Sequence, residues 1–565
     1  MKREFDVIVV GAGPAGSAAS LTLARKGVNV LMLEKSKVPG ERNMSGGVLY
    51  GVLEGGYDMT GLVPDFERTA PLQRRIVSHE VEVLGEPDMR RGTSRLYRLT
   101  KGSLAARLGF LPTGFETGHD FSVLRRPFDL WFAEKAVEAG ATLSTETAAE
   151  GLLIEGGAVV GVRTSKEELR AGLVIDASGV TSALVQEAGL RGALTPRQLY
   201  HGTKWVFKLD GATIERRFRT KPGEGRATLF GGSFMLGTSG WAFIYTNNNT
   251  LSVGLVVSLD SLVRLTTERY SRVGKLIDIE DEFLTHPVVA DLLEGAEAVE
   301  YSVHNMPKGF KCLPKRPYSD GFMVAGDALG ACVKIGPMVD GMRYAIASGA
   351  MAATAYLWAR ESGSYRSRNL SRYRSLLAPV YDDVSRSGRE SFVSESSVAQ
   401  HFLPKLAFGL RALSDTYRFK PSFGGRSGED ALRRVSERMS LLSCDRDVSS
   451  SHVEVDSALA SKSVTKPWAA ICPANCFTVV TAKGVFASFR DVYEHNLELQ
   501  SKESQSLQSA RRKALLQTRE DVADAELRYD PSSCLSCGTC GAVGPAEIVL
   551  FRHDRDSHGV RYRYG

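Results

Sequence analysis

The chain has 565 residues, of which 43% are hydrophobic and 24% charged, and its formal net charge at pH 7 is +6. This length allows three to four domain-sized units with sizeable cores, and no run reaches the ~18 apolar residues of a membrane-spanning helix. The mild positive charge favours an anionic surface, either lipid or an acidic partner, and we expect no nucleic-acid partner.

The first expected elements are a strand, a turn and a helix with the spacing of a dinucleotide-binding site. An apolar run at 7–10 leads into a glycine-rich turn, and the next apolar run ends at Glu34 and Lys35. The turn reads Gly11, Ala12, Gly13, Pro14, Ala15 and Gly16. Its first glycine permits the tight bend, the second lets a pyrophosphate approach a helix N-terminus, and the third allows close packing of helix on strand. Glu34 can accept a hydrogen bond from a ribose hydroxyl, so the pattern predicts a bound dinucleotide. Because the first strand is expected to begin at Phe5, there is no room for a signal peptide.

Two later segments favour FAD over NAD as that dinucleotide. The run LVIDASGVTS (173–182) predicts a buried strand that ends in a turn containing Gly179. The run 321–353 predicts a strand, a turn at Gly326 and Asp327, and a helix of small residues. Asp327 can bond a ribityl hydroxyl, and the helix N-terminus after Gly336-Pro337 can face the pyrimidine end of a flavin. The small residues of this helix also predict close helix packing.

A boundary is expected between about 410 and 466, where glycine, serine and charged residues mix. Before it, the segment HFLPKLAFGLRAL (401–413) places apolar residues at near-helical spacing beside Lys405 and Arg411. Such a segment suits a monotopic membrane contact, and an ordinary core-facing helix fits it equally well.

Half of the eight cysteines lie where they could ligate one metal centre near the C-terminus. Cys534, Cys537 and Cys540 form a C-x2-C-x2-C run, and Gly544-Pro545 stands where a bacterial ferredoxin has its fourth Cys-Pro. Cys472-Pro473 is the expected donor of the fourth thiolate, with Cys476 as the alternative. The spacing favours a 4Fe-4S cluster over zinc, because zinc sites usually use two C-x2-C pairs. A cluster in turn implies a reducing compartment.

These motifs resemble the electron-transfer flavoprotein:quinone oxidoreductase family. The first ~410 residues look like its FixC-type flavoprotein, through VGAGPAG, ERNMSGGVLYG (41–51), FSVLRRPFDLW (121–131), FIYTNNNTLSVGLV (243–256), HPVVADLLEG (286–295), YSVHNMP (301–307) and AGDALG (325–330). The last ~100 look like a FixX-type ferredoxin, through CPANCF, CLSCGTC and GVRYRYG (559–565). The two ends of the chain therefore imply the same family independently.

The resemblance implies an α/β fold with a Rossmann-like FAD-binding domain of the glutathione-reductase type over 1–410. An α+β quinone or substrate lobe is expected as an insertion at roughly 186–315, with a connector at 411–465. A ferredoxin-like domain would follow at 466–565. The flavin contacts so implied are Gly11, Gly13, Gly16, Glu34, Arg125, Asp327 and Gly341, with Ser45, Gly46 and Gly47 along the ring and Pro337 near it. Arg126 is as good a candidate as Arg125. The cluster ligands would be Cys472, Cys534, Cys537 and Cys540.

The chain departs from the family pattern in two places. Cys472 and Cys534 are separated by 61 residues, and the excess, at roughly 487–528, includes a polar run that predicts exposed helices inserted into the ferredoxin-like domain. In addition, Phe551 stands where the family commonly carries a tryptophan.

The function that the resemblance implies is electron transfer from a two-subunit electron-transfer flavoprotein to a membrane quinone, through FAD and one 4Fe-4S cluster. We expect a peripheral protein on the cytoplasmic face of a membrane, and a bifurcating assembly remains open. Quinone reduction needs protons, for which His304 and Tyr301 are weak candidates. The alternatives are a geranylgeranyl-reductase-like flavoenzyme that saturates isoprenoid double bonds, and a non-catalytic scaffold; the cysteine set argues against both.

Overall fold

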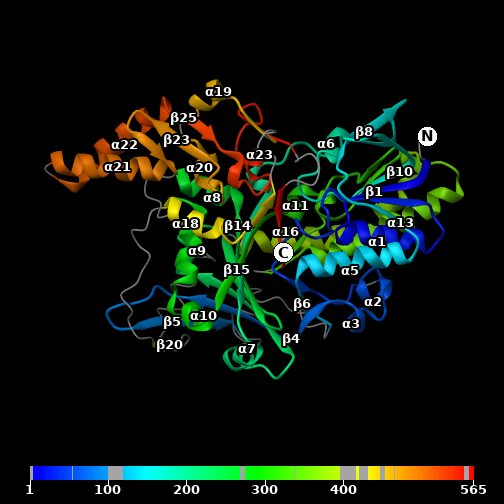
Figure 1. The fold of residues 1–565 in the computed structure, drawn as a ribbon, viewed down its shortest axis with the longest axis horizontal. Helices are drawn as coiled ribbons and strands as arrows, with labels where there is room; N and C mark the ends of the chain where they lie inside the picture. The colour runs from blue at the N-terminus through cyan, green and yellow to red at the C-terminus, as the bar shows by residue number, and fades with distance from the viewer. Residues whose placement is uncertain are drawn as a thin grey trace.

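A computed structural model describes residues 4–53, 55–99, 119–267, 274–335, 338–394, 415–418, 431–445, 452–463, 465–504, 506–552 and 559–565. Two large sheets and a C-terminal lobe make up the described part of the molecule, and the lobe lies at the opposite end of the view from the N-terminus (Figure 1).

The first sheet is mainly parallel and carries the dinucleotide turn. Its strands follow the order β16-β17-β10-β1-β2-β7, and the hairpin of β8 and β9 is attached to β10. Parallel pairing places Val10, Asp176 and Val324 side by side at the carboxyl ends of β1, β10 and β17. Ligands bind at this edge of open α/β sheets. The bounds are β1 (Glu4–Val10), β2 (Val30–Leu33), β7 (Thr142–Ser144), β8 (Ala149–Glu155), β9 (Ala158–Thr164), β10 (Glu168–Asp176), β16 (Tyr318–Ser319) and β17 (Phe322–Val324).

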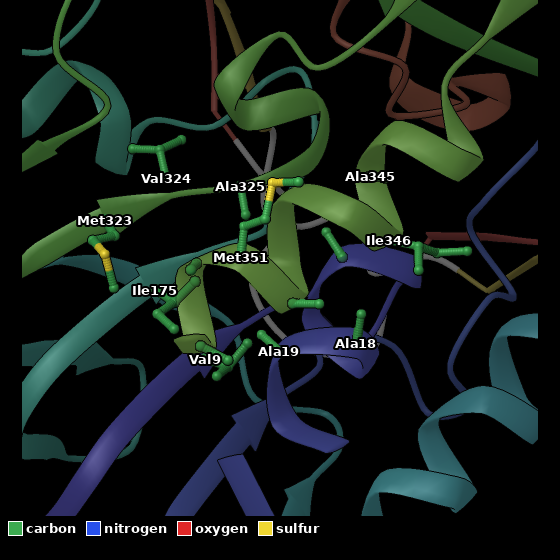
Figure 2. Packing of buried hydrophobic residues seen from close by; sticks show 14 of the residues in the cluster. Val9, Ala18, Ala19, Ile175, Met323, Val324, Ala325, Ala345, Ile346 and Met351 are labelled. Atoms are coloured by element: carbon green, nitrogen blue, oxygen red, sulfur yellow. The ribbon is translucent and has the colours of Figure 1, made fainter. Parts of the chain in front are cut away.

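Three helices pack on this sheet or on one another: α1 (Pro14–Ala24), α5 (Arg125–Glu138) and α13 (Met342–Glu361). Small residues let α1 and α13 approach closely, because a Cβ added at Gly349 would lie 2.0 Å from the carbonyl oxygen of Ala15. Figure 2 shows Val9, Ile175 and Met351 meeting the alanines of these helices in the same core. The small-residue helix therefore packs closely, as its sequence predicts.

The second sheet is mainly antiparallel, with β12 and β4 as its parallel pair. Its order is β15-β11-β14-β13-β12-β4-β5-β20, with β3 and β6 beside β4. The sheet extends beyond the expected lobe at roughly 186–315, because it recruits strands from 48–123 and from 415–418. The bounds are β3 (Val48–Leu49), β4 (Leu72–Leu84), β5 (Thr93–Leu99), β6 (Phe121–Val123), β11 (Leu199–Lys208), β12 (Glu224–Gly232), β13 (Gly240–Thr246), β14 (Thr250–Ser258), β15 (Glu297–Pro307) and β20 (Asp415–Arg418).

The C-terminal lobe, which we call the cysteine lobe, comprises the described residues from 452 to 565. Its centre is the three-stranded sheet β24-β23-β25, and short helices α20 and α23 carry or flank the cysteines. Within the lobe β22 pairs with β26, and β27 pairs with β21, which precedes the lobe in the chain. The bounds are α20 (Pro467–Ile471), β23 (Phe477–Thr481), β24 (Gly484–Phe486), β25 (Glu526–Tyr529), α23 (Thr539–Val543), β21 (Ser443–Asp445), β22 (Val453–Val455), β26 (Val549–Phe551) and β27 (Gly559–Arg561).

A helical hairpin fills the segment between β24 and β25. Helices α21 (Phe489–Glu503) and α22 (Leu507–Ala523) begin at Ser488 and Ser506, whose side chains accept hydrogen bonds from backbone N–H groups of the first turn. Between the helices, the buried Asn496 amide donates to Thr518 and Asp521. The hairpin projects from the end of the lobe (Figure 1).

The last residues of the cysteine lobe lie against the second sheet. Glu300, on β15, accepts hydrogen bonds from the backbone N–H groups of residues 563–565. Lys204, on β11, donates to the carbonyl oxygen of Gly565, and burial lowers the pKa of this lysine to about 8. A buried acid and a buried lysine thus hold the final strand and tail in place.

Some expectations fall on residues that the structure does not describe. These are Gly336, Pro337 and the segment 401–413, together with part of the connector at 411–465. Within the described ranges, no helix is both long and apolar enough to cross a membrane.

Candidate active site

The turn between β1 and α1 is shaped by close backbone contacts. Gly11 has a φ of +100°, and a Cβ there would lie 2.5 Å from the carbonyl oxygen of Ala177, in the turn after β10. A Cβ at Gly16 would lie 1.8 Å from the carbonyl oxygen of Gly11. By contrast, a Cβ at Gly13 would meet only the Asn43 amide, at 3.5 Å. Gly13 therefore borders open space, as a phosphate-binding position requires.

A cavity runs from this turn along the carboxyl ends of the parallel strands. Most of the residues predicted to bind the dinucleotide line it: Gly11, Gly13, Pro14, Ala15, Glu34, Lys35, Ser45, Gly46, Gly47, Arg125, Gly179, Gly326, Asp327 and Gly341. Gly16 and Ala12 lie behind the wall, where Gly16 packs and the Ala12 N–H donates to Glu34. Segments from five parts of the chain thus meet at one cavity.

Glu34 stands at the cavity wall with its carboxylate already anchored. It accepts hydrogen bonds from the backbone N–H groups of Ala12, at 3.0 Å, and Ser36, at 2.9 Å. These bonds fix the acid at the end of β2, and a ribose hydroxyl would add a donor to a group held in position.

The far end of the cavity is formed by the 45–47 loop and by Arg125. Gly46 lies against the Tyr245 ring, since a Cβ there would be 2.8 Å from a ring carbon, and Gly47 has a φ of +100°. Arg125 lines the cavity and forms a bidentate ion pair with the fully buried Asp129, at 2.8 and 3.0 Å. Arg126 does not line the cavity, so Arg125 is the better candidate of the two.

Asp327 and His304 face each other across this end of the cavity, with 4.0 Å between Oδ2 and Nε2. Burial raises the pKa of Asp327 to about 6 and lowers the pKa of His304 to about 3. His304 is therefore a neutral imidazole at pH 7. Tyr301 does not line the cavity; its hydroxyl donates to Glu280 at 2.8 Å, which leaves it a structural residue.

A second cavity lies in the cysteine lobe and is lined by Cys472, Cys476, Cys534, Cys537 and Cys540. Backbone N–H groups donate to two of the sulfurs, Cys476 to Cys472 and Ser536 to Cys534, both at 3.3 Å, and the Thr539 hydroxyl lies 3.1 Å from the Cys537 sulfur. The structure thus brings the four predicted ligands together and adds Cys476. Phe551 also lines this cavity, where it meets His452 edge to face.

Hydrogen-bond donors around thiolates are what an iron–sulfur cluster requires of its protein. A single zinc ion needs its sulfurs within ≈ 2.3 Å of one point. Across the described ranges, no group of three or more His, Cys, Asp or Glu side chains is arranged to hold a single metal ion.

The two cavities share a wall, because Leu535 and Cys537 line both of them. A buried polar network continues from this wall into the second sheet. The Thr539 hydroxyl lies within hydrogen-bond distance of the His201 ring and of the side-chain oxygen of Asn305. The side-chain amide N–H of Asn305 donates to the backbone carbonyl oxygen of Cys537. The sequence does not mark His201 as part of a site, because this histidine stands within an ordinary strand pattern.

Comparison with known proteins supports the flavin assignment. The family model described as FAD dependent oxidoreductase matches residues 6–197. Protein FixC of Escherichia coli K12 is 35% identical over 412 residues, which is 72% of this chain and 89% of FixC. The probable electron transfer flavoprotein-quinone oxidoreductase YdiS of the same organism is 33% identical over 376 residues, which is 66% of this chain and 81% of YdiS.

One solved structure also matches part of this chain. The geranylgeranyl bacteriochlorophyll reductase-like protein of Thermoplasma acidophilum is 20% identical, with a TM-score of 0.49, over 73% of this chain and 99% of that protein.

Proposed function

This chain belongs to the family of FixC and the electron transfer flavoprotein-quinone oxidoreductases, and from that premise we propose that it passes electrons from a reduced two-subunit electron-transfer flavoprotein to a membrane quinone. It is an FAD-dependent oxidoreductase. The proposal adds a 4Fe-4S cluster in the cysteine cavity, the identity of the donor and the identity of the acceptor.

The observation that carries the proposal is the wall shared by the two cavities. FAD and an iron–sulfur cluster supply the electron transfer itself when bound, and the protein supplies position and potential. Because Cys537 borders both cavities, a ligand of the cluster would stand at the edge of the flavin site. A reductase that uses flavin alone has no need of such an arrangement.

The residues have distinct parts in this proposal. Gly13 and the N-terminus of α1 would receive the pyrophosphate, Glu34 the ribose and Asp327 the ribityl chain. The neutral His304 would hold a proton-accepting nitrogen near the ring without adding charge to the cavity. Cys534, Cys537 and Cys540, with Cys472, would hold the cluster, and Cys476 would donate its backbone N–H to Cys472.

A lipid-soluble acceptor also implies contact with a membrane surface, which we propose to be peripheral and cytoplasmic. The same two centres would serve the quinone-side arm of a bifurcating complex, in which the electron donor is one part of a larger assembly.

The test is a quinone-reduction assay after anaerobic purification, with reduced electron-transfer flavoprotein as donor and a short-chain quinone as acceptor. We expect donor-dependent quinone reduction by a protein that contains FAD and about four irons per chain. Zinc in place of iron, or quinone reduction that persists in Cys540→Ala at the wild-type rate, would refute the two-centre pathway. Association with liposomes is measured separately, by flotation.

A further inference from the structure

Lys275 is a buried lysine beside the loop that carries Cys472, at the N-terminal end of α9 (Leu276–Leu284). Its residue exposure is 3%. The ammonium nitrogen donates to the carbonyl oxygen of Ala469, at 2.6 Å, and to the side-chain oxygen of Asn475, at 2.8 Å. These two acceptors stand three residues before and three residues after Cys472, so the Lys275 side chain is bonded to the loop on both sides of this cysteine.

The loop needs such an anchor. Asn475 has a φ of +53°, in the left-handed region that asparagine tolerates better than most residues. Its backbone N–H bonds weakly, at 3.3 Å, to the carbonyl oxygen of Cys472. The bond from Lys275 therefore fixes both the turn and the direction in which the neighbouring thiols point.

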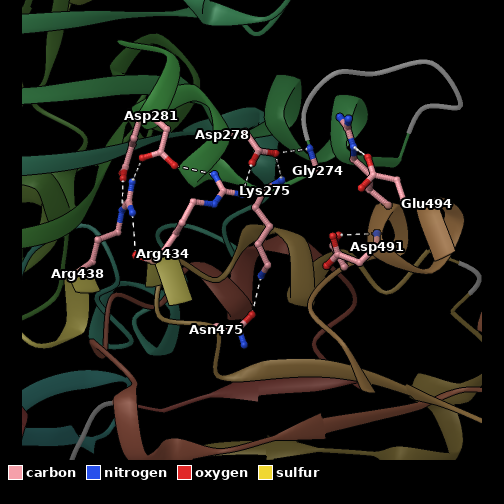
Figure 3. Close-up of polar contacts among 12 residues, drawn as sticks. Gly274, Lys275, Asp278, Asp281, Arg434, Arg438, Asn475, Asp491 and Glu494 are labelled. Atoms are coloured by element: carbon pink, nitrogen blue, oxygen red, sulfur yellow. Dashed lines mark hydrogen bonds and ion pairs between the residues drawn. The ribbon is translucent and has the colours of Figure 1, made fainter. Parts of the chain in front are cut away.

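Lys275 is itself held in place by an ion-pair network (Figure 3). The backbone N–H groups of Gly274 and Lys275 donate to Asp278, which pairs with Arg434 at 3.0 Å. Arg434 also pairs with Asp281, at 2.6 Å. Asp278 is thus paired with an arginine rather than with the Lys275 ammonium.

Neither direct partner of the ammonium carries a charge. A buried ammonium bonded only to neutral oxygens is costly unless a negative charge stands nearby. Burial lowers the pKa of Lys275, and the acidic groups that act in the opposite direction are, in order, Asp491, Cys472, Asp278 and Cys476. Asp491, on α21, makes no ion pair with Lys275 in the described part of the chain, and burial raises the pKa of its carboxyl. Cys472 stands midway between the two residues that the ammonium bonds, so a negatively charged cluster held there would lie close to Lys275.

We propose that Lys275 is the countercharge of the iron–sulfur cluster and the anchor of the Cys472 loop, which makes it a positioning residue that raises the reduction potential of the cluster. The inference rests on the cluster assigned under Proposed function. A positive charge near a cluster stabilises its reduced form, since reduction adds one negative charge.

Four variants test the charge and the anchor separately. Lys275→Met removes both, Lys275→Gln keeps a hydrogen-bond donor without the charge, and Lys275→Arg keeps the charge. Lys483→Met is the matched control, because Lys483 lies in the cysteine lobe and bonds an asparagine and an aspartate away from the cysteine cavity. The readouts are iron and FAD content, and a redox titration of the cluster followed by electron paramagnetic resonance.

We expect Lys275→Gln and Lys275→Met to shift the reduction equilibrium at least tenfold toward the oxidised cluster, which is 59 mV for one electron. Lys275→Arg and Lys483→Met should titrate as the wild type does, and FAD content should be unchanged in all four. Loss of iron from Lys275→Met, with a lowered potential in Lys275→Gln, also supports the proposal. A wild-type potential in Lys275→Gln overturns the countercharge. Absence of iron from the wild-type protein would refute the cluster itself, which is a separate result.

Discussion

The flavin cavity and the cysteine cavity meet at one wall, yet they are held in shape by different parts of the chain. The flavin cavity stands at the ends of parallel strands. Glycines such as Gly11 and Gly16 let neighbouring backbone segments come so close that a Cβ would have no room. The cysteine cavity is lined by side chains from loops and from the short helices α20 and α23, and its backbone is held by hydrogen bonds from Lys275, Trp468 and Asn305.

This difference predicts how each site responds to change. A site formed by packed backbone fails when a side chain is added, because the fold has no room for it. A site formed by side chains on loops fails when a ligand or an outside contact is removed. The two sites should therefore be separable by mutation, although they share a wall.

The largest effect is expected from added side chains at the glycine turn. Gly16→Val places its Cβ 1.8 Å from the carbonyl oxygen of Gly11, so we expect no folded protein. Gly13→Val has room in the protein and projects into the cavity, so it should fold, keep its iron and lose FAD. Flavin and iron content of the purified variants measure this, with Gly192→Ala as a control at an open position. Normal FAD in Gly13→Val would contradict the phosphate assignment.

The next effect is loss of the cluster alone. Cys540 lines the cysteine cavity and not the flavin cavity, so Cys540→Ala should lose the cluster and keep FAD. The pair Cys472→Ala and Cys476→Ala should behave oppositely, with the cluster lost only from the first. Iron analysis and electron paramagnetic resonance of the reduced variants decide between them. A cluster signal in Cys472→Ala that disappears in Cys476→Ala would exchange their roles.

The same difference explains what the sequence could predict. The glycine turn can be recognised from a short stretch of sequence, because the steric role of each glycine depends on residues close to it in the chain. The structure has the strand, the helix and Glu34 where the sequence predicts them. The cysteine spacing likewise brings four thiols to one cavity. Contacts between distant segments leave no local signal. Lys275 bonds Asn475 across 200 residues of chain, and strands from 48–123 join the sheet of the lobe that the sequence places at roughly 186–315.

The tail of the cysteine lobe offers a third, smaller test, because it joins the two regions. Glu300 accepts three backbone N–H bonds from residues 563–565, so Glu300→Ala leaves buried donors without a partner. We expect a loss of about 3 kcal/mol in the free energy of unfolding. Urea unfolding, with the exposed Glu297→Ala on the same strand as control, measures it. An unchanged midpoint would show that the tail contributes nothing to holding the lobe.

The smallest effect concerns Asp327 in the FAD-free protein. Its pKa is raised to about 6 by burial, so between about pH 4 and pH 6 the folded protein holds a proton that the unfolded chain has released. The free energy of unfolding therefore falls as the pH rises through this window, by about 3 kcal/mol at most, and the charged carboxylate destabilises the fold at pH 7. Asp327→Asn should be more stable than the wild type at pH 7 and equal to it at pH 4, although it binds FAD less tightly.

Asp320→Asn is the control, and at pH 7 it should lower the free energy of unfolding instead of raising it. The reason is that the hydrogen bond from Ser367 lowers the pKa of Asp320, so its charged form stabilises the fold. Thermal unfolding of the FAD-free variants across pH 4 to 7 measures both effects. If the stability of Asp327→Asn depends on pH in the same way as that of the wild type, this carboxyl does not titrate between pH 4 and pH 6.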